Sequence, residues 1–343
     1  MAKKHWVRFG IIFFLTAVFL FFFVRSVQWG EVRGYLTDIN LPFFILSIVL
    51  VPLHLLTRGF RWKYLLVHEK PDVSVYNLFA ANAVGFTVNL IFPGRLGELV
   101  KPLYLAKKEN LRKGFCLGTV VVERTFDIFV MCALLGAFML ARPLFVKILP
   151  VDKEAASNLT LWGVIGVAFA TVLLLLTLAL YFFKDRTLRV ITVVLRLLPE
   201  RWSAKILELI GEFIEGLSFF RSPASMLMYG LMSFVVWLGI VFYYWIFFLA
   251  YKQHVPFFFL IPYCFLVMVG ASIPTPGMVG GYHAFSRLAM TSILRMNPNL
   301  AVSMTIVVHA IQLVVTCLVG YAILWKEGLT LFQLKHLGER ETP

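Results

Sequence analysis

Long apolar stretches separated by short polar segments dominate the chain. Six of them approach or exceed the length that an α-helix needs to cross a hydrocarbon core of about 30 Å. Little sequence remains for a soluble domain, so the pattern predicts one all-α integral membrane domain over residues 1–343. The six expected transmembrane helices are Phe9–Val24, Leu41–Leu56, Phe115–Leu140, Leu159–Phe183, Met226–Ala250 and Leu300–Leu324.

The composition agrees with this class. Hydrophobic residues make up 60% of the chain and charged residues 15%, whereas about a quarter of a soluble domain is charged. The first apolar stretch resembles a signal peptide, but no small-residue cleavage site follows it, so we expect a retained span. The four cysteines lie within or beside apolar stretches without CxxC spacing, which predicts buried thiols rather than disulfides.

Positive charge gathers beside the apolar stretches. We attribute the net charge of +14 to cytoplasmic loops and anionic lipid head groups rather than to nucleic acid. Lys3, Lys4 and Arg8 place the amino terminus in the cytoplasm by the positive-inside rule. Six spans then return the carboxyl terminus to the same side. We therefore expect a multi-pass protein of a bacterial cytoplasmic membrane with both termini inside.

Two further apolar segments are not expected to span. Basic residues flank Val73–Phe92 on both sides, and a full crossing would place the following ones outside. We expect this segment, and Phe257–Ile273 in the second half, to form re-entrant helical hairpins. The basic stretch 184–222 has apolar residues between its charges, which predicts a cytoplasmic helix lying in the membrane interface.

The two predicted hairpins end in the same motif. Pro93-Gly94-Arg95-Leu96-Gly97 and Pro276-Gly277-Met278-Val279-Gly280 share the pattern PGxxG and lie 183 residues apart. Each half of the chain has three crossings and one hairpin, so the halves must have opposite orientations. We predict inverted-topology repeats over about residues 7–141 and 157–326, as in many transporters.

The motif has a physical interpretation. Proline and glycine interrupt a helix, and irregular backbone is tolerated within a membrane where it lines a cavity or is buried in protein. The half-helix after each tip points its amino end inward, which favours anions. Gly97 and Gly280 would let a phosphate approach the backbone, and Arg95 would supply a charged donor. Alternatively, the glycines serve only close helix packing.

Several ionisable residues lie at membrane depth. Glu123 and Asp127 share a helix face, with Arg124 between them, and can pair with Arg58, Arg95 or Lys101. They form either a structural ion-pair cluster or a site for a head group or a proton. Glu98 and Lys101 follow the first hairpin tip, and we count them among the candidate residues of this cluster or site. Arg58 and Arg61 are either interface anchors or head-group contacts.

Two histidines accompany the second motif. His283 follows Pro276 by seven residues, and His309 lies inside the last predicted span. No HExxH or other close ligand spacing occurs, so we expect no metal or other cofactor. His309 is either a buried core residue or a residue linked to protons or the head group.

Four sequence strings carry a resemblance to a known family. They are RGFRWKYLL, NLIFPGRLGELVKPLYL, VVERTFDI and IPTPGMVGG. Together they resemble the transmembrane family of lysylphosphatidylglycerol synthase, also called the flippase-like family, over about residues 8–325. Many relatives carry glutamate near the position of His283 and arginine near that of His309. The resemblance points to Arg58, Arg61, Asn89, Pro93, Gly94, Arg95, Gly97, Glu98, Glu123, Arg124, Asp127, Pro276, Gly277 and Gly280.

The resemblance implies a lipid-handling membrane domain. We expect translocation of an anionic, phosphate-bearing phospholipid or a polyprenyl-phosphate-linked intermediate, with a lipid-modifying enzyme as a possible partner. Arg95, with Arg58 or Lys101, would hold the phosphate. Catalytic motifs are not found in the sequence, so we do not expect an enzyme. Two alternatives remain, namely a membrane-embedded enzyme or accessory subunit for lipid-linked sugars and a transporter of a small soluble solute.

Overall fold

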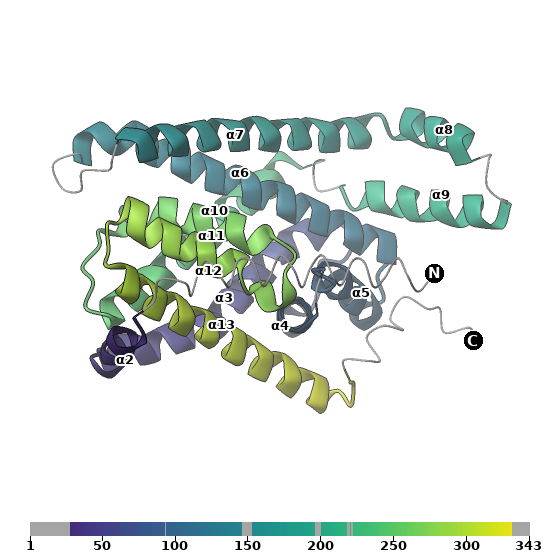
Figure 1. The fold of residues 1–343 in the computed structure, drawn as a ribbon. Coiled ribbons are helices and arrows are strands. Elements are labelled where there is room, and N and C mark those ends of the chain that lie inside the picture. The colour runs from purple at the N-terminus through teal and green to yellow at the C-terminus, as the bar shows by residue number, and fades with distance from the viewer. Residues whose placement is uncertain are drawn as a thin grey trace, which may run out of the picture.

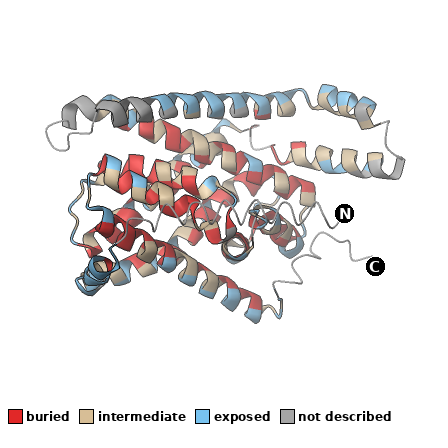
Figure 2. Ribbon diagram, in the orientation of Figure 1, coloured by how far each residue is buried: buried red, intermediate tan, exposed pale blue. Residues whose placement is uncertain are grey.

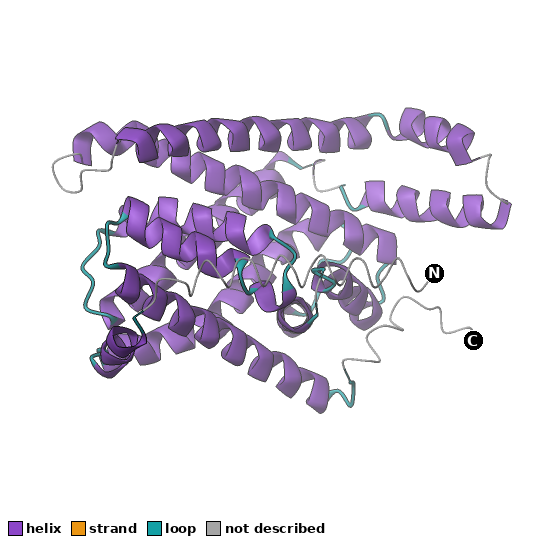
Figure 3. Cartoon of the chain, in the orientation of Figure 1, coloured by secondary structure: helices purple, strands orange, loops and turns teal. Residues whose placement is uncertain are grey.

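The computed structural model describes residues 28–145, 153–195 and 200–330, except residues 93, 218, 219 and 221. Within these ranges the chain is helical and contains no strand (Figures 1 and 3). The α-helices in these ranges are α2 (Trp29–Thr37), α3 (Leu41–Leu66), α4 (Val75–Ile91), α5 (Gly97–Glu109), α6 (Lys113–Phe145), α7 (Lys153–Phe182), α8 (Lys184–Leu195), α9 (Glu200–Glu215), α10 (Pro223–Ala250), α11 (Leu260–Ser272), α12 (Gly281–Leu288) and α13 (Pro298–Lys326). The predicted helical class is confirmed for the described residues.

Four of these helices are long and apolar enough to cross a membrane. They are α3, α6 up to Ala141, α10 and α13, and each contains one predicted span. Helix α7 covers the predicted span Leu159–Phe183 except for its last residue. The predicted span Phe9–Val24 lies outside the described residues. The count of six spans and their orientation stay predictions.

Helix α3 extends ten residues beyond the predicted end at Leu56. Its last turns carry Arg58 and Arg61, whose charge suggested an interface. Both side chains are buried against acids of α6, so the helix continues inside the protein. The hydropathy of α3 alone gives no information about the acids of α6 that neutralise these arginines. The predicted helix therefore ended too early, at Leu56.

The first predicted hairpin is a pair of closely packed helices, α4 and α5. A Cβ atom on Gly97 would lie 1.8 Å from the carbonyl oxygen of Gly85, so the two backbones are in contact where the glycines meet. Gly94 has a φ of +83° and Arg95 a φ of +56° in the connecting turn. A side chain disfavours such left-handed backbone, and glycine is the residue that adopts it readily.

The second predicted hairpin repeats this construction with α11 and α12. A Cβ atom on Gly270 would lie 2.5 Å from the carbonyl oxygen of Gly281. In the turn, Gly277 and Met278 have φ values of +61° and +57°, and Gly280 has +96°. Two PGxxG motifs therefore produce the same left-handed pair of residues after the proline position. This likeness supports the predicted repeat, while entry from opposite sides of a membrane stays a prediction.

Helices α7, α8 and α9 lie outside the central bundle. In Figure 1, α7 runs alongside α6, α8 continues beyond the end of α7, and α9 doubles back and packs against α6. The close approach of α6 and α9 uses glycines again, because a Cβ atom on Gly118 would lie 2.3 Å from the carbonyl oxygen of Phe213. The predicted interfacial stretch 184–222 contains α8 and α9. Figure 2 shows burial concentrated in the bundle and exposure along α7 and α8.

Candidate functional site

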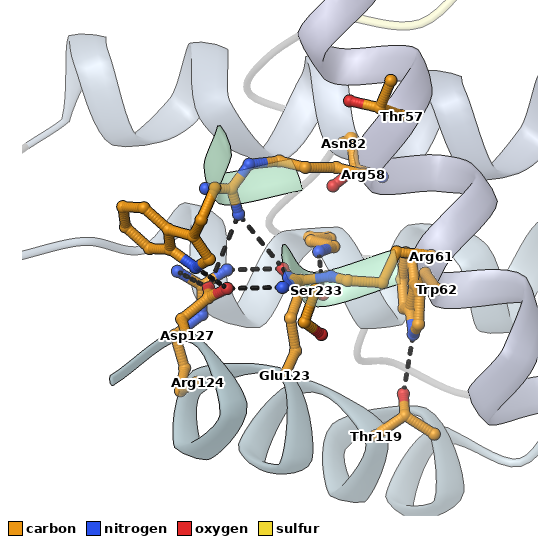
Figure 4. A network of polar contacts seen from close by, with 12 residues as sticks. Thr57, Arg58, Arg61, Trp62, Asn82, Thr119, Glu123, Arg124, Asp127 and Ser233 are labelled. Atoms are coloured by element: carbon orange, nitrogen blue, oxygen red, sulfur yellow. Dashed lines mark hydrogen bonds and ion pairs between the residues drawn. The ribbon is translucent and has the colours of Figure 1, made fainter. Parts of the chain in front are cut away.

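Two bases on α3 face two acids on α6. Arg58 and Arg61 are three residues apart, and Glu123 and Asp127 are four apart, so each pair shares a helix face. Arg61 Nη1 lies 2.5 Å from Asp127 Oδ1, and its Nη2 lies 3.1 Å from Glu123 Oε1. Arg58 Nη1 lies 3.5 Å from Glu123 and 3.6 Å from Asp127. All four side chains are buried and converge between the helices (Figure 4).

Lys101, Arg124 and Glu98 complete what we call the ion-pair cluster. Lys101 Nζ lies 2.6 Å from Glu123 Oε2 and 4.3 Å from the centre of the Trp62 ring. Arg124 Nη2 lies 2.6 Å from Glu123, and its Nη1 lies 3.3 Å from Asp127. Its Nε lies 3.4 Å from Glu98 Oε2. The structure thus brings seven predicted residues together.

Bases outnumber acids in this cluster. Arg58, Arg61, Lys101 and Arg124 face Glu98, Glu123 and Asp127. A buried charge is unfavourable unless an opposite charge neutralises it. An anion bound beside the cluster would therefore complete its charge balance.

Neutral residues that the sequence did not single out support the cluster. Trp237 Nε1 donates to Asp127 Oδ1 at 3.0 Å, and Arg58 Nε donates to His54 Nε2 at 2.8 Å. His54 lies one helical turn before Arg58, a spacing that could have revealed it. Trp237 is 110 residues from its partner and carries no local signal.

A cavity of about 290 Å³ borders the cluster. Arg58, Arg124 and Asp127 line it on one side, and Arg95 lines it from the first hairpin tip. Arg61 and Lys101 belong to the cluster but not to the cavity wall. Three arginines thus face one carboxylate among the described residues of the wall. The rest of the wall is largely apolar and aromatic, with Val51, Phe86, Leu90, Ile128, Ile240, Val267, Met268 and Met278 among its residues.

Arg95 joins the two hairpins beside this cavity. Its Nη2 donates to the carbonyl oxygen of Ala271 at 2.9 Å, while its buried Nε has no hydrogen-bond partner. No described carboxylate lies within ion-pair distance of it. The tips also approach where a Cβ atom on Gly277 would lie 3.2 Å from the carbonyl oxygen of Leu90. One guanidinium therefore holds the hairpin tips together and retains unused donor capacity.

The start of α5 is occupied by the protein itself. The N–H groups of Glu98 and Leu99 donate to the carbonyls of Arg95 and Leu96, at 3.1 and 3.0 Å. The space beside Gly97 is filled by the Gly85 carbonyl and by Asn89, whose Oδ1 would lie 2.6 Å from an added Cβ. These contacts favour the helix-packing interpretation of Gly97 over a phosphate contact. Asn89 Nδ2 in turn donates to Glu98 Oε1 at 3.4 Å.

The motif prolines add little to this description. Pro93 lies outside the described residues, and Pro276 opens the short 3-10 turn Pro276–Met278. Gly94 is exposed in its turn, and nothing lies within 4 Å of an added Cβ there. Among the described motif residues, Arg95 of the first motif and Met278 of the second line the cavity.

The two histidines lie together, and one of them lines the cavity. The His309 ring stacks on Tyr282 with a centroid distance of 4.5 Å, and His283 meets His309 edge-on at 4.8 Å. His309 belongs to the cavity wall, whereas His283 does not. The described residues contain no group of three metal-ligating side chains that could hold an ion.

Paired helical hairpins beside a cavity with excess positive charge, in a bundle of membrane-length helices, define an α-helical membrane protein. The sequence identifies the family to which this membrane protein belongs. The chain belongs to the family described as the lysylphosphatidylglycerol synthase TM region, whose sequence profile matches residues 6–320.

Comparison with individual proteins gives a more distant likeness. The chain is similar to the UPF0104 membrane protein MJ1595 of Methanocaldococcus jannaschii, with 26% identity over 129 residues. The aligned part covers 37% of this chain and 38% of that relative. No solved structure matches. The match of the family profile to residues 6–320 confirms the predicted family.

Proposed function

We propose that the protein moves an anionic, phosphate-bearing lipid between the leaflets of the cell membrane. The substrate would be a phospholipid or a polyprenyl-phosphate-linked intermediate. The observation that carries this proposal is the cavity wall, where Arg58, Arg95 and Arg124 face Asp127. Guanidinium groups are well suited to phosphate, and their attraction is stronger in a low-dielectric interior than in water.

The cavity suits a lipid head group. Its volume of about 290 Å³ lies near the lower limit of cavities that hold small molecules. Acyl chains would then stay in the surrounding bilayer, and the apolar residues of the wall would contact their first carbons. A free inorganic anion would leave this apolar surface without a partner.

The hairpins would serve as gates. Arg95 bonds a neutral carbonyl oxygen of Ala271, and a charged phosphate oxygen is the stronger acceptor. Binding of the phosphate would draw Arg95 away from Ala271 and so release the contact between the tips. Glu98, Glu123 and Asp127 would keep the remaining bases in place. A nucleotide-binding motif is not found in the sequence, so transport would be downhill or coupled to an ion.

The environment of Asp127 favours binding over catalysis. This carboxylate accepts bonds from Arg61 at 2.5 Å and from Trp237 at 3.0 Å. A group fixed in this way serves as a counter-ion, whereas an acid or base catalyst must reach the substrate. We therefore propose a transporter rather than a lipid-modifying enzyme.

Native mass spectrometry of the purified protein tests the binding step. The wild-type protein should retain anionic phospholipid, and Arg95→Ala should retain at least about tenfold less, because a charge-assisted hydrogen bond contributes about 1.5–3 kcal/mol. Arg33→Ala is the matched control, since Arg33 is exposed on α2 and does not line the cavity. Equal retention by wild type and Arg95→Ala would contradict the proposal.

A further inference from the structure

The cavity has a second end that differs in chemistry from the arginine end. Tyr243, Tyr244, Tyr282, His309 and Gln312 line it there. Helix α10 runs from one end of the cavity to the other. Its Trp237 donates to Asp127 at the arginine end, and Tyr243 follows six residues later on the same helix. At a rise of about 1.5 Å per residue, these positions are about 9 Å apart along the helix. The cavity therefore runs from a cationic end to a hydroxyl-rich aromatic end.

The aromatic end contains hydrogen-bonding capacity that the protein leaves unused. Gln312 Nε2 donates to Tyr244 Oη at 3.2 Å, and the hydroxyls of Tyr244 and Tyr282 lie 3.1 Å apart. His309 Nε2 has no hydrogen-bond partner, and the Tyr243 hydroxyl has none other than the side chain of Gln312. Tyr243 and His309 are only 5% and 4% exposed. Buried polar atoms normally have their hydrogen bonds satisfied, so an unpaired imidazole nitrogen and a phenol with spare capacity on one cavity wall indicate a ligand that supplies the missing bonds.

The charges of the wall restrict what that ligand carries. Among its described residues, Asp127 is the one carboxylate, and it is held by Arg61 and Trp237 at the opposite end. A head group ending in an ammonium would place a positive charge in a cavity that already has three arginines. An alcohol, in contrast, both donates to an imidazole nitrogen and accepts from a phenol.

We propose that the aromatic end is a subsite for an uncharged, polyhydroxylated group, such as glycerol or a sugar, attached to the lipid phosphate. This inference rests on the proposed function and deepens it by naming the substrate class. The phosphate lies at Arg58, Arg95 and Arg124, and the hydroxyls lie at Tyr243 and His309. Tyrosine rings on both α10 and α12 then cover the apolar face of the polyol.

A competition between head groups tests the subsite. Purified protein is equilibrated with vesicles containing equal amounts of phosphatidylglycerol, phosphatidic acid and phosphatidylethanolamine, and bound lipids are counted by native mass spectrometry. Phosphatidic acid keeps the phosphate but lacks the polyol, and phosphatidylethanolamine carries an ammonium. We expect phosphatidylglycerol to exceed each of the others by about threefold to tenfold, the effect of one or two hydrogen bonds.

The variants locate this preference in the cavity. Tyr243→Phe and Gln312→Leu should bring the ratio of phosphatidylglycerol to phosphatidic acid near one, while total anionic lipid stays at the wild-type level. Tyr251→Phe is the matched control, because this hydroxyl lies at the end of the same helix, faces Ser303 at 3.4 Å and is outside the wall. Its ratio should equal that of the wild type.

Each outcome separates the subsite from the proposed function. Equal binding of phosphatidylglycerol and phosphatidic acid by the wild type, with both lost in Arg95→Ala, would overturn the subsite and leave the phosphate site standing. An unchanged ratio in Tyr243→Phe and Gln312→Leu, or a preference for phosphatidylethanolamine, would also overturn it. Retention of no anionic lipid by the wild type would overturn both.

Discussion

Replacing Asp127 by asparagine removes one acid of the ion-pair cluster and nearly preserves the shape of the side chain. Three guanidinium groups share this carboxylate, with Arg61 at 2.5 Å, Arg124 at 3.3 Å and Arg58 at 3.6 Å. Four bases would then face two acids in a buried site. Removing one partner of a buried ion pair costs about 3–5 kcal/mol, because the remaining charge is uncompensated. We expect Asp127→Asn to lower the free energy of unfolding by that amount.

Denaturant unfolding in mixed micelles, followed by tryptophan fluorescence, measures this change as a shift of the midpoint at constant slope. The control is Asp38→Asn, because Asp38 pairs with Lys252 and its side chain is 73% exposed. An exposed pair contributes about 0–1 kcal/mol. Adding Arg61→Gln to Asp127→Asn should recover part of the loss, since contacting residues couple by about 0.5–3 kcal/mol. A loss in Asp127→Asn no larger than in Asp38→Asn would refute the reasoning.

Two further substitutions test the first hairpin at its glycine contact and at the end of α5. Gly97→Ala should destabilise the protein by about 1–3 kcal/mol, because the added Cβ forces the hairpin backbones apart. The control is Gly34→Ala on α2, where the added Cβ meets nothing within 4 Å and should stabilise the helix slightly. Equal unfolding midpoints for the two variants would contradict the close contact. Burial raises the pKa of Glu109, but hydrogen bonds from Lys70 and Asn77 outweigh this and hold the pKa below its usual value of 4.5. Glu109 therefore stabilises the fold above that pH and loses this contribution as the pH falls below it. Glu109→Gln should flatten the pH dependence of unfolding on the acid side of pH 4.5, and an unchanged profile would contradict this.

The hairpin turns were predictable because their signal is local. Glycine after proline in both motifs indicated a break, and Gly94 and Gly277 have the left-handed backbone that glycine adopts readily. The contact between arms was less evident. Gly85 and Gly270 have no motif around them, and their role follows from partners eleven or twelve residues away across a turn.

The candidate site was predictable only in its charges. Arg58, Arg61, Glu123 and Asp127 stood out because ionisable residues are rare in apolar helices. Their pairing across α3 and α6 depends on packing that no local pattern records. Lys101 was expected at the phosphate, but it lies behind the wall against Glu123 at 2.6 Å, and Arg124 takes its place at the cavity.

In the neutral half of the cavity, His309 was a candidate from the sequence, but its tyrosine and glutamine neighbours were not predictable. Tyr243 and Gln312 lie within apolar spans, where aromatic and amide residues are usual packing elements. They meet because α10 and α13 pack around the second hairpin. The unused hydrogen-bonding capacity at Tyr243 and His309 identifies this end of the cavity, and it can be recognised only from the positions of the side chains.

Movement of a labelled lipid across vesicle membranes tests the central claim most directly. Purified protein is reconstituted into vesicles containing a fluorescent phosphatidylglycerol, and a membrane-impermeant quencher reports the fraction in the outer leaflet over time. We predict exchange well above that of protein-free vesicles, with Arg95→Ala reduced about tenfold and Arg33→Ala unchanged. Exchange at the protein-free rate, with phosphatidylglycerol and with other phosphate-bearing head groups, would contradict the account.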